Sequence, residues 1–194
     1  YFNANTPADQ TLWAKAVKDA ATLKKLGATA VWFPPATKGA AGKDDRGYAP
    51  YDLYDLGEFN QKGSVGTRYG TKKEYLEAID AMKAQGINVY ADIAVRQKLG
   101  ADSVEKVTAA DFNAKDIPQM IGNKKIVGAL SKFTFPGRKS KYSKFKWNWN
   151  HFAGIDWQQD DFKRRVCELS GMTETEAEKK YKLSKYDYII GREL

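Results

Sequence analysis

Cysteine and histidine are almost absent from this 194-residue sequence, since each occurs once, as Cys167 and His151. A single cysteine excludes an internal disulfide, and a single histidine excludes a metal site built mainly from imidazoles. No apolar run approaches the roughly 20 residues that a membrane-spanning helix needs, so we expect no membrane partner. The sequence also lacks a phosphate-binding glycine loop, a zinc-ligand pattern and a nucleophile-elbow serine. Several common types of active site are therefore excluded, and the compartment stays open.

Positive charge is in excess, with a formal net charge of +8, and much of it lies in one stretch without acidic residues. A solvated basic face is the interpretation we favour. The alternative is a surface for an anionic partner, such as nucleic acid or an acidic protein. Aromatic residues interleave with these cations, which suits base stacking and suits a packed aromatic core equally well. The basic residues of this stretch are Lys124, Lys125, Lys132, Arg138, Lys139, Lys141, Lys144 and Lys146.

Alternating helical and strand-like patterns fill the first 95 residues. Residues 9–26 carry apolar side chains at three- and four-residue spacing before Gly27, which predicts a helix with a glycine stop. A second helix is predicted from Thr71, where Thr71 and Glu74 form a capping-box sequence, to Gly86. The apolar runs 28–33 and 87–95 are typical of strands, and residues 1–2 are read as the end of an earlier one. This order predicts an α/β fold with parallel strands.

The pattern changes after residue 100. Residues 101–123 are mixed and polar, and residues 124–157 are aromatic and basic. We expect a short helix within 160–169, a charged helix at 173–182 and a final strand at 186–190.

A long loop, residues 47–71, connects the second predicted strand to the second helix. It is rich in Tyr, Asp and Gly and follows neither helical nor strand periodicity. Loops of this length are usually functional or specifically packed. Its tyrosines Tyr48, Tyr51 and Tyr54 can stack on sugar rings, although packing with a tethered hydroxyl is the favoured interpretation. Asp52 and Asp55 are expected to brace the loop.

Asp92 interrupts the apolar run 87–95 near its C-terminal end, where parallel α/β folds bind their ligands. A buried carboxylate needs a polar or charged partner. From spacing alone, a functional role and a structural role are equally supported. Arg96 and Gln97, just downstream, are candidate partners.

Three stretches together resemble the α-amylase family of glycoside hydrolases, of the bacterial liquefying type. They are LGATAVWFPPATK (26–38) with the loop and helix that follow it, INVYADIAVRQKLGAD (87–102), and FTFPGRKSKYSKFKWNWNHFAGIDW (133–157) followed by YDYII (186–190). The resemblance implies a partial (β/α)8, or TIM, barrel in residues 1–99, with three barrel strands. It further implies an inserted, mostly β domain B with a return strand in residues 100–194.

The family hydrolyses α-1,4-glucosidic bonds with retention, using two carboxylates. The resemblance implies that these come from later barrel strands, so we expect no catalytic residue in a chain that ends at Leu194. It assigns Tyr48 and Asp92 to substrate binding, together with Gln97, which stands where the family has a sugar-contacting histidine. Arg96 replaces a calcium-ligating asparagine, and a cation cannot ligate calcium. Asp187 is then the one well-matched calcium ligand, and we expect no cofactor.

These departures predict a degenerate α-amylase-like protein without hydrolase activity of its own, acting as a structural or interaction subunit. One alternative is a fragment of an active α-amylase that hydrolyses starch. Another is a non-catalytic glucan-binding module, for which Tyr48 and the aromatic segment argue. Because half a barrel leaves open sheet edges, we expect other protein chains to cover it. A basic surface at 124–146 remains the candidate contact for an anionic partner.

Overall fold

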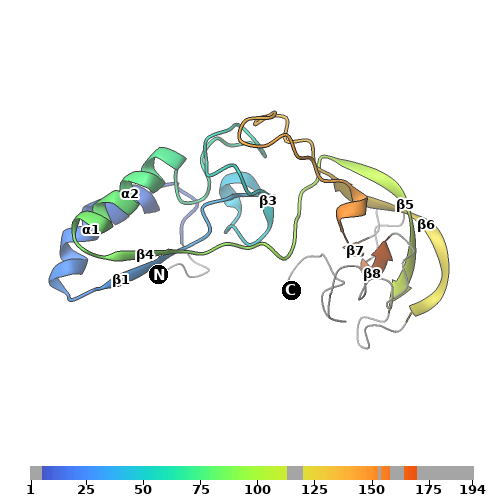
Figure 1. The fold of residues 1–194 in the computed structure, drawn as a ribbon, viewed down its shortest axis with the longest axis horizontal. Helices are drawn as coiled ribbons and strands as arrows, with labels where there is room; N and C mark the ends of the chain where they lie inside the picture. Colours follow the sequence, from blue (N-terminus) through green and yellow to red (C-terminus); the bar gives the residue numbers. More distant parts are fainter. Residues whose placement is uncertain (1–5, 113–119, 153, 158–163, 170–194) are drawn as a thin grey trace. The chain divides into compact units, whose positions relative to one another are not determined.

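The computed structural model describes residues 6–112, 120–152, 154–157 and 164–169 and divides the chain into two compact units (Figure 1). The first unit comprises residues 1–95 and 135–144, and the second comprises residues 96–134 and 145–194. The segments predicted at 1–2, 173–182 and 186–190, with Asp187, lie outside the described residues. Among the described residues, no helix is long and apolar enough to cross a membrane.

In the first unit, two helices pack against a pair of parallel strands. The helices are α1 (Leu12–Lys25) and α2 (Lys72–Ala84), and the strands are β1 (Ala30–Phe33) and β4 (Asn88–Ala91). Figure 1 shows both helices on the same side of the strands. The predicted parallel α/β arrangement is therefore present in the described residues as one β-α-β unit.

Trp13 of α1 is the centre of this unit's core and is fully buried. Its ring centroid lies 5.2 Å from that of Phe33, 5.5 Å from that of Tyr69 and 4.9 Å from that of Tyr75. These partners come from β1, the long loop and α2, so a single indole joins three segments. Tilted aromatic pairs at such distances add to the stabilisation from buried area.

Local signals place the start of α2 and the C-terminal ends of both helices close to where the sequence predicts them, whereas α1 begins at Leu12, three residues after its predicted start. Thr71 accepts a hydrogen bond from the Glu74 N–H at 3.4 Å, and the Glu74 carboxylate accepts one from the Thr71 N–H at 2.7 Å, which confirms the capping box. Gly27 and Gly86 follow the helices with φ of 84° and 65°, the left-handed conformation that glycine adopts without strain.

The strand predicted at 87–95 is shorter than expected. The run 87–95 is apolar throughout most of its length, but β4 ends at Ala91. The N–H of Asp92 still donates to the carbonyl of Phe33 at 3.0 Å, after which the chain leaves the pair. Ile93 and Val95 are exposed beyond that point. Apolar composition alone therefore did not mark where strand pairing stops.

Short elements precede and begin the long loop of the first unit. Strands β2 (Lys38–Gly39) and β3 (Pro50–Asp52) form a small antiparallel pair, with the 3-10 turn η1 (Gly42–Asp44) between them. All three strand residues of β3 are buried. The loop is thus a packed part of the structure, as its composition predicted.

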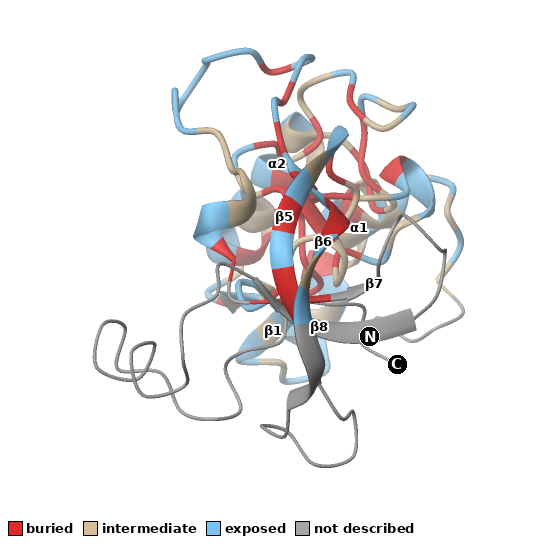
Figure 2. Cartoon of the chain, turned by 90° about the vertical axis from the view of Figure 1, so that its right-hand side faces the viewer, coloured by how far each residue is buried: buried red, intermediate tan, exposed pale blue. Residues whose placement is uncertain are grey.

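The second unit contains an antiparallel sheet with strand order β6-β5-β8-β7. Its strands are β5 (Ser103–Phe112), β6 (Met120–Lys132), β7 (Gly154–Trp157) and β8 (Arg164–Leu169), and a 3-10 turn, η2 (Trp149–His151), precedes β7. Figure 2 shows buried and exposed residues alternating along β5, as expected for strands with one covered face.

The helix predicted within 160–169 is wrong for residues 164–169, which form β8. This strand pairs with β5 on one side and β7 on the other. β5 is distant in sequence, and no local turn signal marks β7. Pairing with other strands outweighs local propensity in strands. The polar stretch 101–123 likewise gave no signal for β5, which pairs with β6 from Ser103 to Phe112.

Candidate functional site

A tyrosine and an aspartate meet at the C-terminal end of β4. The Tyr48 hydroxyl donates a hydrogen bond to the Asp92 carboxylate, although the two residues are 44 positions apart in the sequence. Tyr48 lies in the loop that follows β1, and Asp92 directly follows β4, the parallel partner of β1. Both side chains are partly exposed. The structure therefore places them at the strand end where α/β folds bind ligands.

The backbone before Tyr48 is fixed by several contacts. Gly47 has φ of 94°, and a Cβ there would lie 2.6 Å from the Pro35 Cβ, so only glycine fits. The Gly47 N–H donates to the Asp45 carboxylate at 2.7 Å. One residue earlier, the Arg46 carbonyl accepts from the Tyr69 hydroxyl at 2.9 Å. Burial raises the pKa of Tyr69 to about 12, which keeps this donor protonated.

The pair offers a recognisable combination of groups to a ligand. The Asp92 carboxylate can accept hydrogen bonds from a ligand. The Tyr48 ring presents an apolar face, and its hydroxyl already donates to Asp92. A sugar ring has hydroxyl donors at its rim and C–H groups on its faces, so a carboxylate beside an aromatic ring matches it.

Asp55 braces the loop from inside, as predicted. One of its carboxylate oxygens accepts from three successive N–H groups, those of Gly57 and Glu58 at 2.9 Å and Phe59 at 3.3 Å. Asp52 accepts from the Tyr54 N–H at 3.1 Å in the same way. Both carboxylates are buried, and their roles are structural.

The three loop tyrosines differ in environment. Tyr51 is buried, with its ring 5.3 Å from that of Phe135, so it packs as the favoured interpretation held. Tyr54 is half-exposed and lies under the Arg138 guanidinium, 5.3 Å from ring centroid to guanidinium carbon. Tyr48 bonds the candidate site residue Asp92.

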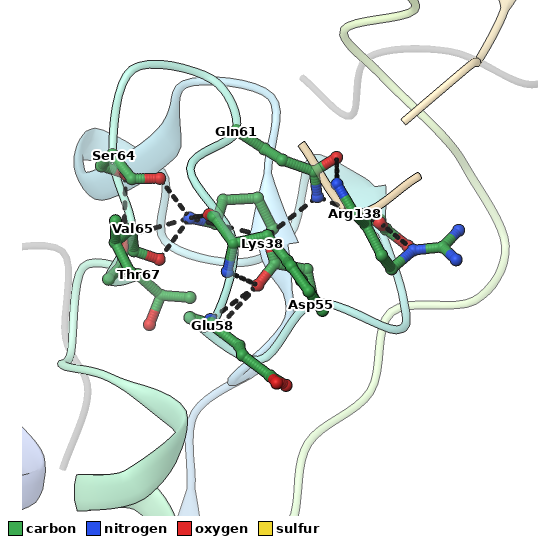
Figure 3. A network of polar contacts seen from close by, with 12 residues as sticks. Lys38, Asp55, Glu58, Gln61, Ser64, Val65, Thr67 and Arg138 are labelled. Carbon is green, nitrogen blue, oxygen red and sulfur yellow. Dashed lines mark hydrogen bonds and ion pairs between the residues drawn. The ribbon is translucent and has the colours of Figure 1, made fainter. Parts of the chain in front are cut away.

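A buried polar network links this loop to segment 135–144 (Figure 3). The Gln61 amide nitrogen donates to Asp52 at 3.0 Å and to Asp55 at 2.9 Å. The Arg138 Nε donates to Asp52 at 2.6 Å, and Lys38 forms an ion pair with Asp55 at 3.7 Å. Sequence reasoning missed Lys38 and gave Arg138 a different role. The available signal was the two aspartates in a tyrosine-rich loop, which need buried countercharges.

Arg138 therefore does not contribute to an exposed basic face, because its side chain is fully buried. Lys141 is exposed but donates to Glu58, which also accepts from Lys72 at 2.9 Å and from the Tyr142 hydroxyl at 2.7 Å. These contacts lower the pKa of Glu58 to about 2, the bond from Lys141 being the largest cause.

The remaining basic residues are divided between the two units. Lys139 and Lys144 are exposed in the first unit. The second unit holds Lys146 and the three lysines of β6, namely Lys124, Lys125 and Lys132.

Gln97 lies in the second unit, where its side chain is buried, whereas Tyr48 and Asp92 lie in the first. Its neighbour Arg96 is exposed. A guanidinium has no lone pair to give a metal ion, so Arg96 does not fit a calcium-ligand role. Among the described residues, no three His, Cys, Asp or Glu side chains gather as a metal-binding group.

An aromatic cluster lies near η2 in the second unit. Trp147 stacks on Phe152 at a centroid distance of 5.5 Å, and Phe145 meets Trp147 edge-on at 5.2 Å. His151 lies 4.9 Å from Phe145, and its Nδ1 accepts from the Asn148 N–H at 3.0 Å. The cluster is partly exposed to solvent, since Phe145 and His151 are exposed.

Comparison with known proteins finds no matching family model but several similar proteins. The chain is 46% identical to an α-amylase of Geobacillus stearothermophilus over 195 residues, which cover 100% of this chain and 35% of that protein. It is 46% identical to a glucan 1,4-α-maltohexaosidase of Bacillus sp. (strain 707), covering 82% of this chain and 30% of that protein. It is 43% identical to an α-amylase of Bacillus licheniformis, with 98% and 37% covered. The chain thus spans about a third of the length of these relatives.

Among solved structures, an alternansucrase in complex with isomaltononaose superposes with a TM-score of 0.58. The match has 24% sequence identity and covers 71% of this chain and 12% of that chain. A likeness at this identity concerns the fold alone.

Proposed function

Because this chain corresponds to part of an α-amylase family member, we propose that it supplies one wall of a site for α-1,4-linked glucan. Tyr48 and Asp92 contact the sugar in this proposal. The observation that carries it is the hydrogen bond between them at the C-terminal end of β4. Gln97 stands where the resemblance places a sugar-contacting histidine, and its role in sugar binding stays a prediction.

The proposed architecture is the beginning of a (β/α)8 barrel with an inserted domain B. The parallel strands β1 and β4, with α2 between them in sequence, support the barrel part. The antiparallel sheet of the second unit supports the domain B part. Segment 135–144 belongs to the first unit, so the chain passes between the units three times. Further barrel strands, on this polypeptide or on another, would cover the open side of β1 and β4.

Glucan binding is tested by calorimetric titration with maltoheptaose. Tyr48→Ala removes the ring and the hydroxyl that holds Asp92, and it is expected to weaken binding about tenfold, since an aromatic contact and a hydrogen bond each contribute about 1 kcal/mol. Tyr48→Phe keeps the ring but frees Asp92, and a smaller loss is expected. Tyr54→Ala in the same loop is the matched control. Absence of heat with the unaltered protein, or equal losses in the Tyr48 and Tyr54 variants, would contradict the proposal.

We propose that the chain does not hydrolyse starch by itself. Arg96 and Gln97, standing where the resemblance places Asn and His, support this. The alternative, a fragment of an active α-amylase, is supported by the 46% identity to such an enzyme. Incubation with soluble starch at high protein loading, followed by measurement of reducing ends, distinguishes the inactive chain from the active fragment. Reducing ends that disappear in Asp92→Asn would support the active alternative.

A further inference from the structure

The ammonium group of Lys38 lies inside a cage of backbone carbonyl oxygens. Its Nζ donates to the carbonyls of Val65 at 2.6 Å, Ser64 at 2.7 Å, Phe59 at 3.2 Å and Gly66 at 3.4 Å. Figure 3 shows the side chain pointing into the curve of the loop that carries these carbonyls. The Lys38 side chain is fully buried.

The charge of Lys38 is balanced nearby. Asp55 lies 3.7 Å away and is equally buried, and Gln61 connects it to the buried pair of Asp52 and Arg138. Two acidic and two basic side chains therefore make the network neutral. Burial lowers the pKa of Lys38, and the Asp55 carboxylate opposes that shift. An unpaired buried ion would cost far more than this neutral arrangement.

Lys38 and Asp55 bind different backbone groups of the loop. Asp55 accepts from three N–H groups in residues 57–59, whereas Lys38 takes carbonyl oxygens from residues 59–66. Carbonyls of successive residues do not normally converge on one point, and the loop includes Lys62 with φ of 52° and Gly63 with φ of 78°. A cation at the centre offsets the repulsion between these oxygens.

We propose that this carbonyl cage is a monovalent-cation site whose occupant is the chain's own Lys38 ammonium. It follows that a chain with a short uncharged residue at position 38 binds K⁺ or NH₄⁺ there. In the selectivity filters of K⁺ channels, backbone carbonyl oxygens replace the hydration shell of the ion. Ca²⁺ and Mg²⁺ require shorter contacts and more carboxylates or waters than this cage offers.

The test compares the thermal unfolding of Lys38→Ala in KCl, NH₄Cl and choline chloride at equal ionic strength. Choline is too large to enter, so it controls for salt screening. A ligand that binds only the folded state stabilises by RT ln(1 + [L]/Kd), and the Tm of Lys38→Ala is expected to rise with K⁺ or NH₄⁺. Two matched variants should show no such dependence. Lys38→Met fills the cage with an uncharged side chain, and Lys62→Ala removes a lysine outside it. An equal Tm of Lys38→Ala in all three salts would overturn the proposal.

A second measurement needs no destabilised variant. In the unaltered protein, ¹⁵N-edited spectra of the lysine ammonium groups are recorded near neutral pH. Exposed ammonium protons exchange too fast to be seen, whereas a caged ammonium keeps its protons. We expect a protected lysine signal that is absent in Lys38→Arg and present in Lys62→Arg. If no lysine ammonium is protected, the cage is not occupied by a cation and the proposal fails, whatever the outcome for glucan binding.

Discussion

Arg138 and Asp52 form an almost completely buried ion pair, with 0% and 1% of their side chains exposed. Arg138→Met keeps much of the volume but leaves Asp52 as a buried charge without its partner. Breaking such a pair from one side costs roughly 3–5 kcal/mol. We expect a loss of that order in the free energy of unfolding, measured by urea denaturation. Lys144→Met, on the same segment and exposed, should change it by less than about 0.5 kcal/mol. Equal effects would contradict the assigned role of Arg138.

Glu58 is expected to make the free energy of unfolding depend on pH, and the direction of this dependence follows from its contacts. Its pKa is lowered from 4.5 to about 2 in the folded protein. A carboxylate whose pKa is lower in the folded than in the unfolded state contributes stability at pH values above its pKa in the unfolded state. That contribution is lost as the pH falls towards its pKa in the folded state. The difference in unfolding free energy between the unaltered protein and Glu58→Gln should therefore shrink between pH 5 and pH 2.

The size of this effect is limited by solvent, because Lys141 is half-exposed. Glu77→Gln is the control, since Glu77 faces Lys73 on the exposed surface of α2. A Glu58→Gln difference that stays constant with pH would contradict the assigned contacts.

The two helices differ in how they begin. At α2 the Thr71 side chain accepts from the Glu74 N–H, whereas at α1 the Thr11 side chain makes no capping bond. Replacing a capping threonine by alanine costs about 1 kcal/mol. Thr71→Ala should therefore lower the free energy of unfolding by about that amount, and Thr11→Ala by clearly less. Denaturant titration of both variants measures this, and equal losses would show that the cap is not formed.

Elements set by neighbouring residues were predictable from the sequence, and elements set by distant residues were not. The Thr71 capping box and the glycine stops at Gly27 and Gly86 act within a few residues, so their patterns identified them. Strand β8 depends on pairing with β5 and β7, so the helix predicted there was wrong.

The same distinction applies to the candidate site. Motif resemblance marked Tyr48 and Asp92 separately, but their hydrogen bond joins residues 44 positions apart. Lys38 carries no motif of its own. Its role depends on carbonyl oxygens 21 to 28 residues away, and no side-chain pattern reports the position of a backbone carbonyl.

At the scale of the whole molecule, the pair of β1 and β4 has one covered face. Val31 and Phe33 pack towards the helices, whereas Trp32 and its partner Tyr90 face away and are 61% and 63% exposed. Among the described residues, β1 and β4 pair only with each other. Neighbouring large apolar side chains and unpaired strand edges favour association with further protein.

The 194-residue chain alone is therefore predicted not to be a monodisperse monomer. Light scattering at increasing concentration should show association, which Trp32→Lys combined with Tyr90→Lys should reduce because charges on this face oppose its burial in an interface. Leu26→Lys is the control, since Leu26 is also a highly exposed apolar residue but lies at the C-terminal cap of α1. A stable monomer with a cooperative thermal transition would contradict the prediction. Association that Leu26→Lys reduces as strongly would place the contact elsewhere than on β1 and β4.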